Sequence, residues 1–185
     1  MLTVVTSCTS TPRYVEGAER LQRQCEEFGL AFRRYDLHPP EDVENLRMWA
    51  AGQKPLVCLQ AFKDGIDELL YIDADDEIVG IPGEFPECAI GLWRNYELDL
   101  FPTHLIWCSN VYAKRCKFAE AFILLWSRLS WSLKNEHRTL HNVWTIYYNC
   151  FADPQPIKDV TASVSGCIKG NPSPLGYRKE AVVVH

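Results

Sequence analysis

Four carboxylate side chains follow directly after a short apolar run in the first half of the chain. The run is Leu-Leu-Tyr-Ile at 69–72, and the carboxylates are Asp73, Asp75, Asp76 and Glu77. Negative charges this close together repel one another, and the end of a strand needs none of them for packing. A bound cation would offset the repulsion, so this stretch indicates a metal site.

Asp73 and Asp75 have a spacing that suits a hard divalent cation. In an extended segment, residues two apart point the same way, so both carboxylates can face one ion, with the small Ala74 between them. Mg²⁺ or Mn²⁺ at such a site typically uses one or two carboxylates together with the phosphates of a nucleotide. The pair therefore predicts a divalent-cation site that receives a phosphorylated ligand.

Two other interpretations of the same residues stay open. The stretch can be a solvated acidic turn. Alternatively, Asp73 can be a nucleophile that accepts a phosphoryl group, with Asp75 as its acid/base partner, as in haloacid-dehalogenase-like phosphatases. Those enzymes carry the motif on the first strand of the domain, whereas here it begins at residue 73.

The elements before the acidic stretch must place it at the edge of a sheet. Hydrophobic periodicity and the positions of glycine and proline predict alternating strands and helices. The expected elements are a strand at 2–6, a helix at 14–28, a strand at 30–37, helices at 41–52 and 54–65, and a strand ending in the acidic stretch. This order implies a largely parallel sheet with the carboxylates at the carboxyl end of a strand, where open α/β sheets bind ligands.

The second half of the chain continues this organisation. The patterns predict strands at 87–93 and 103–113, helices at 117–133 and about 136–148, and a β-branched strand near 180–185. No linker or internal repeat interrupts the sequence. The expectation is a single α/β domain over residues 1–185, with a mostly parallel central sheet flanked by helices.

Charge and composition narrow the range of functions. The 185 residues have a formal net charge of −5, which gives no overall basic field for nucleic acid or an anionic membrane. No stretch reaches the roughly 18 uncharged apolar residues of a membrane span, and the first residues do not have the pattern of a signal peptide. We therefore expect a cytoplasmic protein with no membrane span.

The eight cysteines do not indicate a zinc site. No two of them stand in a CxxC or CxxxC relation, which removes the usual zinc spacings. Several lie inside apolar runs, where a free thiol behaves as a small hydrophobic side chain. Reduced thiols and a reducing compartment are expected.

The stretches 2–10 (LTVVTSCTS), 54–62 (KPLVCLQAF) and 68–80 (ELLYIDADDEIVG), in this order, resemble the nucleotide-diphospho-sugar transferases of the GT-A fold. The resemblance implies a Rossmann-like domain whose first strand and loop hold the nucleotide and whose Asp-x-Asp binds Mn²⁺ or Mg²⁺ and the diphosphate. The matching cofactor-binding positions are Thr6, Ser7, Lys54 and the Asp73-Ala74-Asp75 segment, and Asp73 and Asp75 are also the metal ligands.

Downstream stretches carry further assignments by the same resemblance. It places Asn110 near the donor sugar and Glu136 at the acidic position of a catalytic helix, with Glu where the family has Asp and His137 where it has Gln. It also makes His185 a third metal ligand. A terminal histidine ligand is a feature of the retaining enzymes, so retention is expected; an inverting enzyme would need a carboxylate base, for which Glu136 and Asp99 are the candidates.

The function implied by the resemblance is metal-dependent sugar transfer by a glycosyltransferase of the hexosyltransferase class. The donor is a nucleotide-diphosphate sugar, with UDP as the favoured nucleotide, and the acceptor hydroxyl belongs to a glycan, a lipid, a protein or a modified DNA base. The alternatives are the phosphatase, a sugar nucleotidyltransferase, and a non-catalytic relative that binds nucleotide sugars. The nucleotidyltransferases usually have a glycine-rich loop after the first strand, and SCTSTPR at 7–13 contains no glycine.

Overall fold

The structure of the chain is a computed structural model. It describes residues 1–94, 106–133, 139–140, 142–143, 145–146, 156–160 and 167–169. Within these residues, no helix is both long enough and apolar enough to cross a membrane.

The first half of the chain alternates strands and helices. Its elements are β1 (Thr3–Cys8), α1 (Pro12–Glu27), β2 (Ala31–Asp36), α2 (Leu46–Lys63) and β3 (Glu68–Ile72). β1 pairs in parallel with β2 on one side and with β3 on the other. The β-α-β organisation expected from the sequence is confirmed, and the acidic stretch follows the carboxyl end of β3.

The expectation of two helices between β2 and β3 is wrong, because α2 is one continuous helix with Pro55 inside it. The helix begins after Asn45, whose side chain accepts a hydrogen bond from the backbone N–H of Met48 at 3.0 Å. Proline usually marks a helix start because it lacks an N–H and disfavours the helical conformation of the preceding residue. Here Ala51 and Gly52 before it and Val57 after it are buried, so packing holds both sides of the proline in one helix.

The central sheet has the strand order β2-β1-β3-β6-β5-β7 within the described part of the chain. Its second half consists of β5 (Ile90–Arg94), β6 (Ile106–Lys114) and β7 (Ile157–Asp159). β6 runs antiparallel to β3 and β5, and the other neighbouring pairs are parallel. The expected mostly parallel sheet is thus confirmed, with one reversed strand beside β3.

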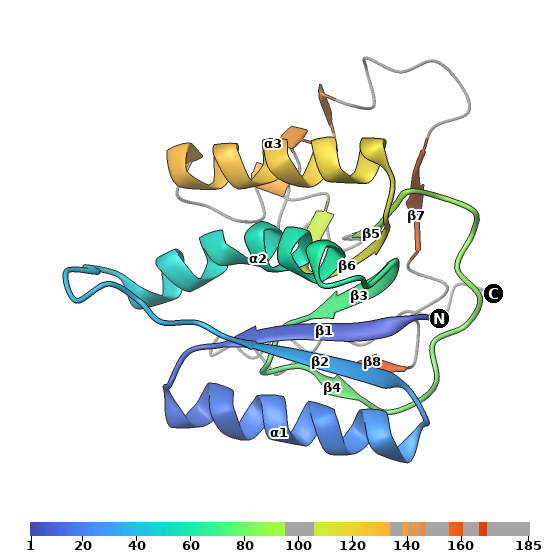
Figure 1. Cartoon of the computed structure of the whole chain (residues 1–185), viewed down its shortest axis with the longest axis horizontal. Coiled ribbons are helices and arrows are strands. Elements are labelled where there is room, and N and C mark those ends of the chain that lie inside the picture. The colour runs from blue at the N-terminus through green and yellow to red at the C-terminus, as the bar shows by residue number, and fades with distance from the viewer. Residues whose placement is uncertain are drawn as a thin grey trace, which may run out of the picture.

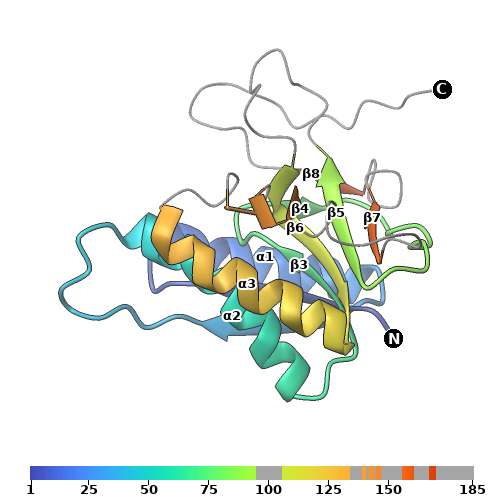
Figure 2. The same cartoon turned by 90° about the horizontal axis from the view of Figure 1, so that it is seen from above.

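Helices cover both faces of this sheet, as Figures 1 and 2 show. α2 and α3 (Lys117–Leu133) lie together on one face, where Tyr71 and Trp126 belong to the larger buried cluster. α1 lies on the other face, where Leu21 packs in a second cluster with Leu70 and Ile72. Alternate residues of β3 therefore enter different clusters, as the two-residue period of a strand requires.

A short second sheet lies beside α1 and was not expected from the sequence. It pairs β4 (Glu77–Ile78) antiparallel with β8 (Ile168–Lys169). β4 begins at Glu77, the last carboxylate of the acidic stretch, so residues 73–76 form a turn, called the acidic turn below, between a central strand and this small sheet. Of the helix expected at 136–148, the described residues 139–140, 142–143 and 145–146 are helical, and the strand expected at 180–185 lies outside the described residues.

Candidate functional site

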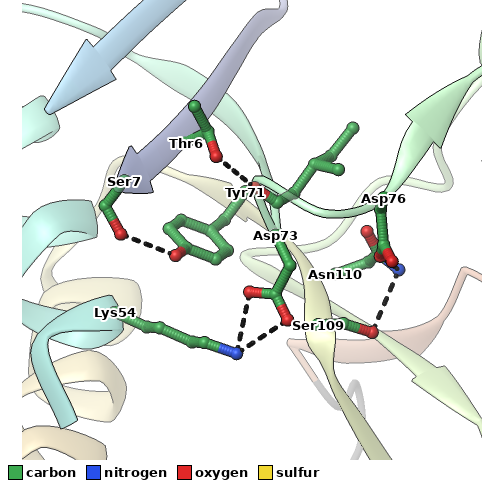
Figure 3. Close-up of polar contacts among 9 residues, drawn as sticks. Thr6, Ser7, Lys54, Tyr71, Asp73, Asp76, Ser109 and Asn110 are labelled. Carbon is green, nitrogen blue, oxygen red and sulfur yellow. Dashed lines mark hydrogen bonds and ion pairs between the residues drawn. The ribbon is translucent and has the colours of Figure 1, made fainter. Parts of the chain in front are cut away.

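The candidate site lies where β1 and β3 end side by side. Both strands run in the same direction, so the residues after Cys8 and after Ile72 share one edge of the sheet. β3 also has the antiparallel β6 as its other neighbour, which brings Ser109 and Asn110 to the same edge. Figure 3 shows the polar side chains that meet there.

Asp73 forms an ion pair with Lys54 of α2. The ammonium Nζ lies 2.8 Å from Oδ1 and 2.9 Å from Oδ2 of the carboxylate. The backbone N–H of Asp73 also donates to the carbonyl oxygen of Ser109 at 3.0 Å. Lys54 is only 6% exposed, and a lysine is rarely this buried unless it has a charged partner. The pair therefore fixes the orientation of Asp73 and places a buried positive charge at the end of β3.

Asp75 and Glu77 are paired with arginines of α1. Nη2 of Arg13 lies 3.2 Å from Oδ2 of Asp75. Nε of Arg20 lies 3.5 Å from Oε1 of Glu77, and its Nη2 donates to the backbone oxygen of Asp76 at 3.3 Å. One helix thus supplies two of the cations that face the acidic stretch.

Asp76 is buried, at 2% exposure, and points toward β6. Its Oδ2 lies 3.4 Å from Nδ2 of Asn110, a long hydrogen bond, and Nδ2 also lies 3.3 Å from Oγ of Ser109. The backbone N–H of Asp76 donates to the oxygen of Asp73 at 3.0 Å, which closes the turn. Oδ1 of Asn110 has no hydrogen-bond partner among the described residues.

These ion pairs weaken one reason for expecting a bound metal ion, namely that the clustered carboxylates need a cation to offset their repulsion. Asp73, Asp75 and Glu77 each face a cation of the chain, namely Lys54, Arg13 and Arg20 respectively, so their repulsion is offset without any bound ion. The clustering of charge alone therefore does not require a metal. The case for a cation rests on the position and exposure of particular carboxylates.

Asp73 and Asp75 fit a divalent cation that is shared with a phosphate ligand. Both follow β3 directly, and their side chains are 22% and 29% exposed, so solvent and ligand can reach them. Within the described ranges, no group of three or more His, Cys, Asp or Glu side chains is arranged to hold a metal. Two carboxylates are enough for Mg²⁺ when phosphates and water supply the other ligands. The predicted third ligand, His185, lies outside the described residues.

The absence of a side chain at Gly17 lets helix α1 approach the acidic turn closely. Gly17 of α1 packs against the backbone carbonyl of Ala74 so tightly that a Cβ at position 17 would overlap the carbonyl oxygen. Ala74 itself is buried in a small cluster with Cys8 and Ala18. The small residue between the two aspartates therefore has a packing role, and the turn rests directly on the helix.

Thr6 and Ser7 tie β1 to β3 through their side chains. The hydroxyl of Thr6 donates to the carbonyl oxygen of Ile72 at 2.7 Å, and Oγ of Ser7 lies 2.8 Å from the hydroxyl of Tyr71. Tyr71 is buried, and burial together with the charge of Asp73 holds the pKa of its phenol well above 10. These hydroxyls support the end of β3, and their contact with a nucleotide stays a prediction.

The structure brings most of the predicted site residues together and adds others. Thr6, Ser7, Lys54, the 73–75 segment and Asn110 meet at one sheet edge, whereas Glu136, Asp99 and His185 lie outside the described residues. The sequence interpretation missed Arg13, Gly17, Arg20 and the buried position of Asp76. The spacing of positions 13, 17 and 20 marks one helical face, but nothing local to it identifies the acidic turn as its partner.

Comparison with known proteins gives matches at the level of structure. No known family profile matches the sequence, and no curated protein sequence matches it significantly. A glycosyltransferase involved in the glycosylation of the major capsid of PBCV-1 superposes with a TM-score of 0.63 at 13% identity, over 86% of this chain and 83% of that one. The galactosyltransferase LgtC, in complex with donor and acceptor sugar analogues, gives a TM-score of 0.47 at 10% identity, over 76% and 69%. The likeness to the PBCV-1 enzyme shows that the chain has the GT-A-like fold of a glycosyltransferase.

Proposed function

We propose that this protein is a metal-dependent glycosyltransferase that takes a sugar from a nucleotide-diphosphate sugar, with a UDP-sugar as the leading donor. A fold alone does not define an activity, so the proposal depends on the site. The observation that carries it is the placement of Asp73 and Asp75 at the carboxyl end of β3, inside a glycosyltransferase fold. Open α/β sheets bind their ligands at this edge.

Asp73 and Asp75 would hold the divalent cation, Mn²⁺ or Mg²⁺. When bound, the cation supplies Lewis-acid stabilisation of the negative charge that develops on the departing diphosphate. Lys54 keeps Asp73 in a fixed orientation through both carboxylate oxygens. A fixed carboxylate does not have to reorganise during the reaction, which favours catalysis.

In this proposal, the side chain of Asn110 accepts a hydrogen bond from the donor sugar. Its side chain is 2% exposed, and its Oδ1 lacks a partner among the described residues, while its Nδ2 is used by Asp76 and Ser109. A buried acceptor without a donor is costly. A sugar hydroxyl is a donor that satisfies it.

The proposal also includes the stereochemistry of the sugar transfer and the kind of acceptor. Retention follows from the resemblance to enzymes with a terminal histidine ligand, and Glu136 or Asp99 would serve as base if the reaction inverts. The acceptor is a hydroxyl of a glycan, lipid, protein or modified DNA base. The PBCV-1 neighbour takes part in glycosylating a capsid, so protein-linked acceptors are the first to test.

The test is release of UDP from a panel of UDP-sugars in the presence of Mn²⁺, without an acceptor, because glycosyltransferases can pass the sugar to water. Asp75→Ala should lower the rate about 100-fold or more, since it removes a ligand of the Lewis acid. Asp67→Ala is the matched control. Asp67 lies directly before β3, at the end of the strand away from the acidic turn, and its side chain is 72% exposed.

The outcomes of this test distinguish a transferase from a non-catalytic relative. Release of UDP that survives Asp67→Ala and is lost in a folded Asp75→Ala variant supports the transferase. A folded Asp75→Ala variant with the wild-type rate contradicts it. No release from any UDP-sugar by the wild-type protein favours the non-catalytic relative.

A further inference from the structure

The three cations that face the acidic turn are not equivalent. Lys54 is almost completely buried and contacts both oxygens of Asp73. Arg20 is tied to the turn at two points, the backbone oxygen of Asp76 and the carboxylate of Glu77. These two cations are part of the support of the turn.

Arg13 differs from both in exposure and in the number of its contacts with the turn. Its side chain is 55% exposed, and its contact with the turn is a single one, at 3.2 Å from Oδ2 of Asp75. Its guanidinium carbon also lies 5.9 Å from the centroid of the neighbouring Tyr14 ring. Gly17, one helical turn later, fixes this face of α1 against the turn, so the backbone of Arg13 stays beside Asp75 while its side chain can move.

We propose that Arg13 is an exchangeable counterion at this site: it neutralises Asp75 in the empty protein and binds the diphosphate of the donor when Asp75 binds the divalent cation. This inference rests on the proposed function. It assigns the recognition of the diphosphate to a residue that comes from α1 and lies outside the Asp-x-Asp segment.

The exchange follows from the strengths of the interactions involved. Arg13 and a divalent cation would compete for the same carboxylate, and an exposed ion pair contributes little, so Arg13 is easily displaced. A guanidinium matches two phosphate oxygens at once and forms strong charge-assisted hydrogen bonds with them. The displaced arginine therefore gains a better partner at the same sheet edge.

Calorimetric titrations of the full chain test this assignment with two probes, Mn²⁺ alone and UDP in the presence of Mn²⁺. The variants are Arg13→Gln and, as matched control, Arg23→Gln. Arg23 is an exposed arginine of the same helix, so both variants change the net charge equally.

Arg13→Gln should change the two affinities in opposite directions. Removing the competitor should raise the affinity for Mn²⁺ alone about two- to fivefold. Losing the charge-assisted bonds should lower the affinity for UDP with Mn²⁺ about tenfold or more. Arg23→Gln should leave both affinities within about twofold of the wild type, since position 23 makes no contact that the exchange uses.

Three results would overturn the assignment. If Arg13→Gln binds UDP with wild-type affinity while the wild-type protein needs Mn²⁺ for binding, the role of Arg13 is refuted and the transferase proposal stands. If both variants weaken UDP binding equally, the loss comes from the changed net charge of the protein and not from a contact between Arg13 and the diphosphate. If the wild-type protein binds no UDP in Mn²⁺, the proposed function fails and the exchange fails with it.

Discussion

Lys54 and Asp73 form the interaction on which the geometry of the site depends most. The lysine is buried, and the side chain of the aspartate is 22% exposed. An ammonium in such a place is stable only with its partner, because leaving one charge of a buried pair alone is costly. The pair links α2, which carries the lysine, to the turn that carries the candidate metal ligands.

At the residue scale, we expect Lys54→Met to destabilise the protein. The methionine removes the counterion of Asp73 and should lower the free energy of unfolding by about 2–4 kcal/mol, somewhat less than for a fully buried pair because the carboxylate is partly solvated. Urea unfolding measures the change. The added substitution Asp73→Asn should restore part of the loss, since it removes the uncompensated charge.

Lys63→Met is the control for this prediction. Lys63 is exposed in the last turn of the same helix, so its replacement makes the same chemical change away from the site. Its effect should stay within about 0.5 kcal/mol. A Lys54→Met protein as stable as the Lys63→Met protein would show that the ion pair does not support the turn.

At the scale of elements, helix α1 is the support of the acidic turn. Its Gly17 meets the backbone of Ala74, and the arginines on either side of that contact pair with the turn. β4 and β8 hold the turn from its other end. The positions of Asp73 and Asp75 are therefore set by a helix that precedes them in the chain by more than forty residues.

Gly17→Ala tests this packing. Alanine is the better helix former by about 1 kcal/mol, but here its Cβ would overlap a backbone oxygen, which cannot turn away as a side chain can. We expect a net loss of about 1–2 kcal/mol in the free energy of unfolding, in the range of overpacked sites. The displaced turn should also weaken the binding of UDP in Mn²⁺.

Glu16→Ala provides the comparison. Glu16 is exposed on the same helix, so its replacement by alanine probes helix propensity without the contact. Both variants can be measured by urea unfolding and by calorimetry with UDP. If Gly17→Ala is at least as stable as Glu16→Ala and binds UDP as the wild type does, the helix does not position the turn.

The sequence predicts the elements whose signals are local. α1, α3, β1 and β3 follow from apolar periodicity, and each lies where the pattern indicated, within a few residues. Pro55 misled the prediction of α2 because tertiary packing overrides a local break signal. β4, β7 and β8, of two or three residues each, exist only through pairing with distant segments, which no local pattern reveals.

The same limit applies to the site. The sequence predicts Asp73 and Asp75 as site residues because their residue type, spacing and position after an apolar strand are all local features. The pairing of Lys54 with Asp73 follows from the packing of α2, and the contacts of Arg13 and Arg20 with the turn follow from the packing of α1. Such contacts link residues far apart in the chain, so spacing cannot predict them.

At the scale of the whole molecule, the fold brings the candidate site residues to one edge of the central sheet, which has six strands within the described part of the chain. α2 contributes Lys54, α1 contributes Arg13, β3 leads into the aspartates, and β6 contributes Asn110. The chain thus has a glycosyltransferase fold with a polar site at the edge where such sheets bind ligands. Cytoplasmic location stays a prediction.

The central claim is that Asp73 and Asp75 form a nucleotide-diphosphate site that requires a divalent cation. The most direct measurement is calorimetric titration of the wild-type protein with UDP, once in Mn²⁺ and once in a metal chelator. The account predicts saturable binding in Mn²⁺ and none in the chelator. Equal binding under both conditions, or no binding under either, would contradict it.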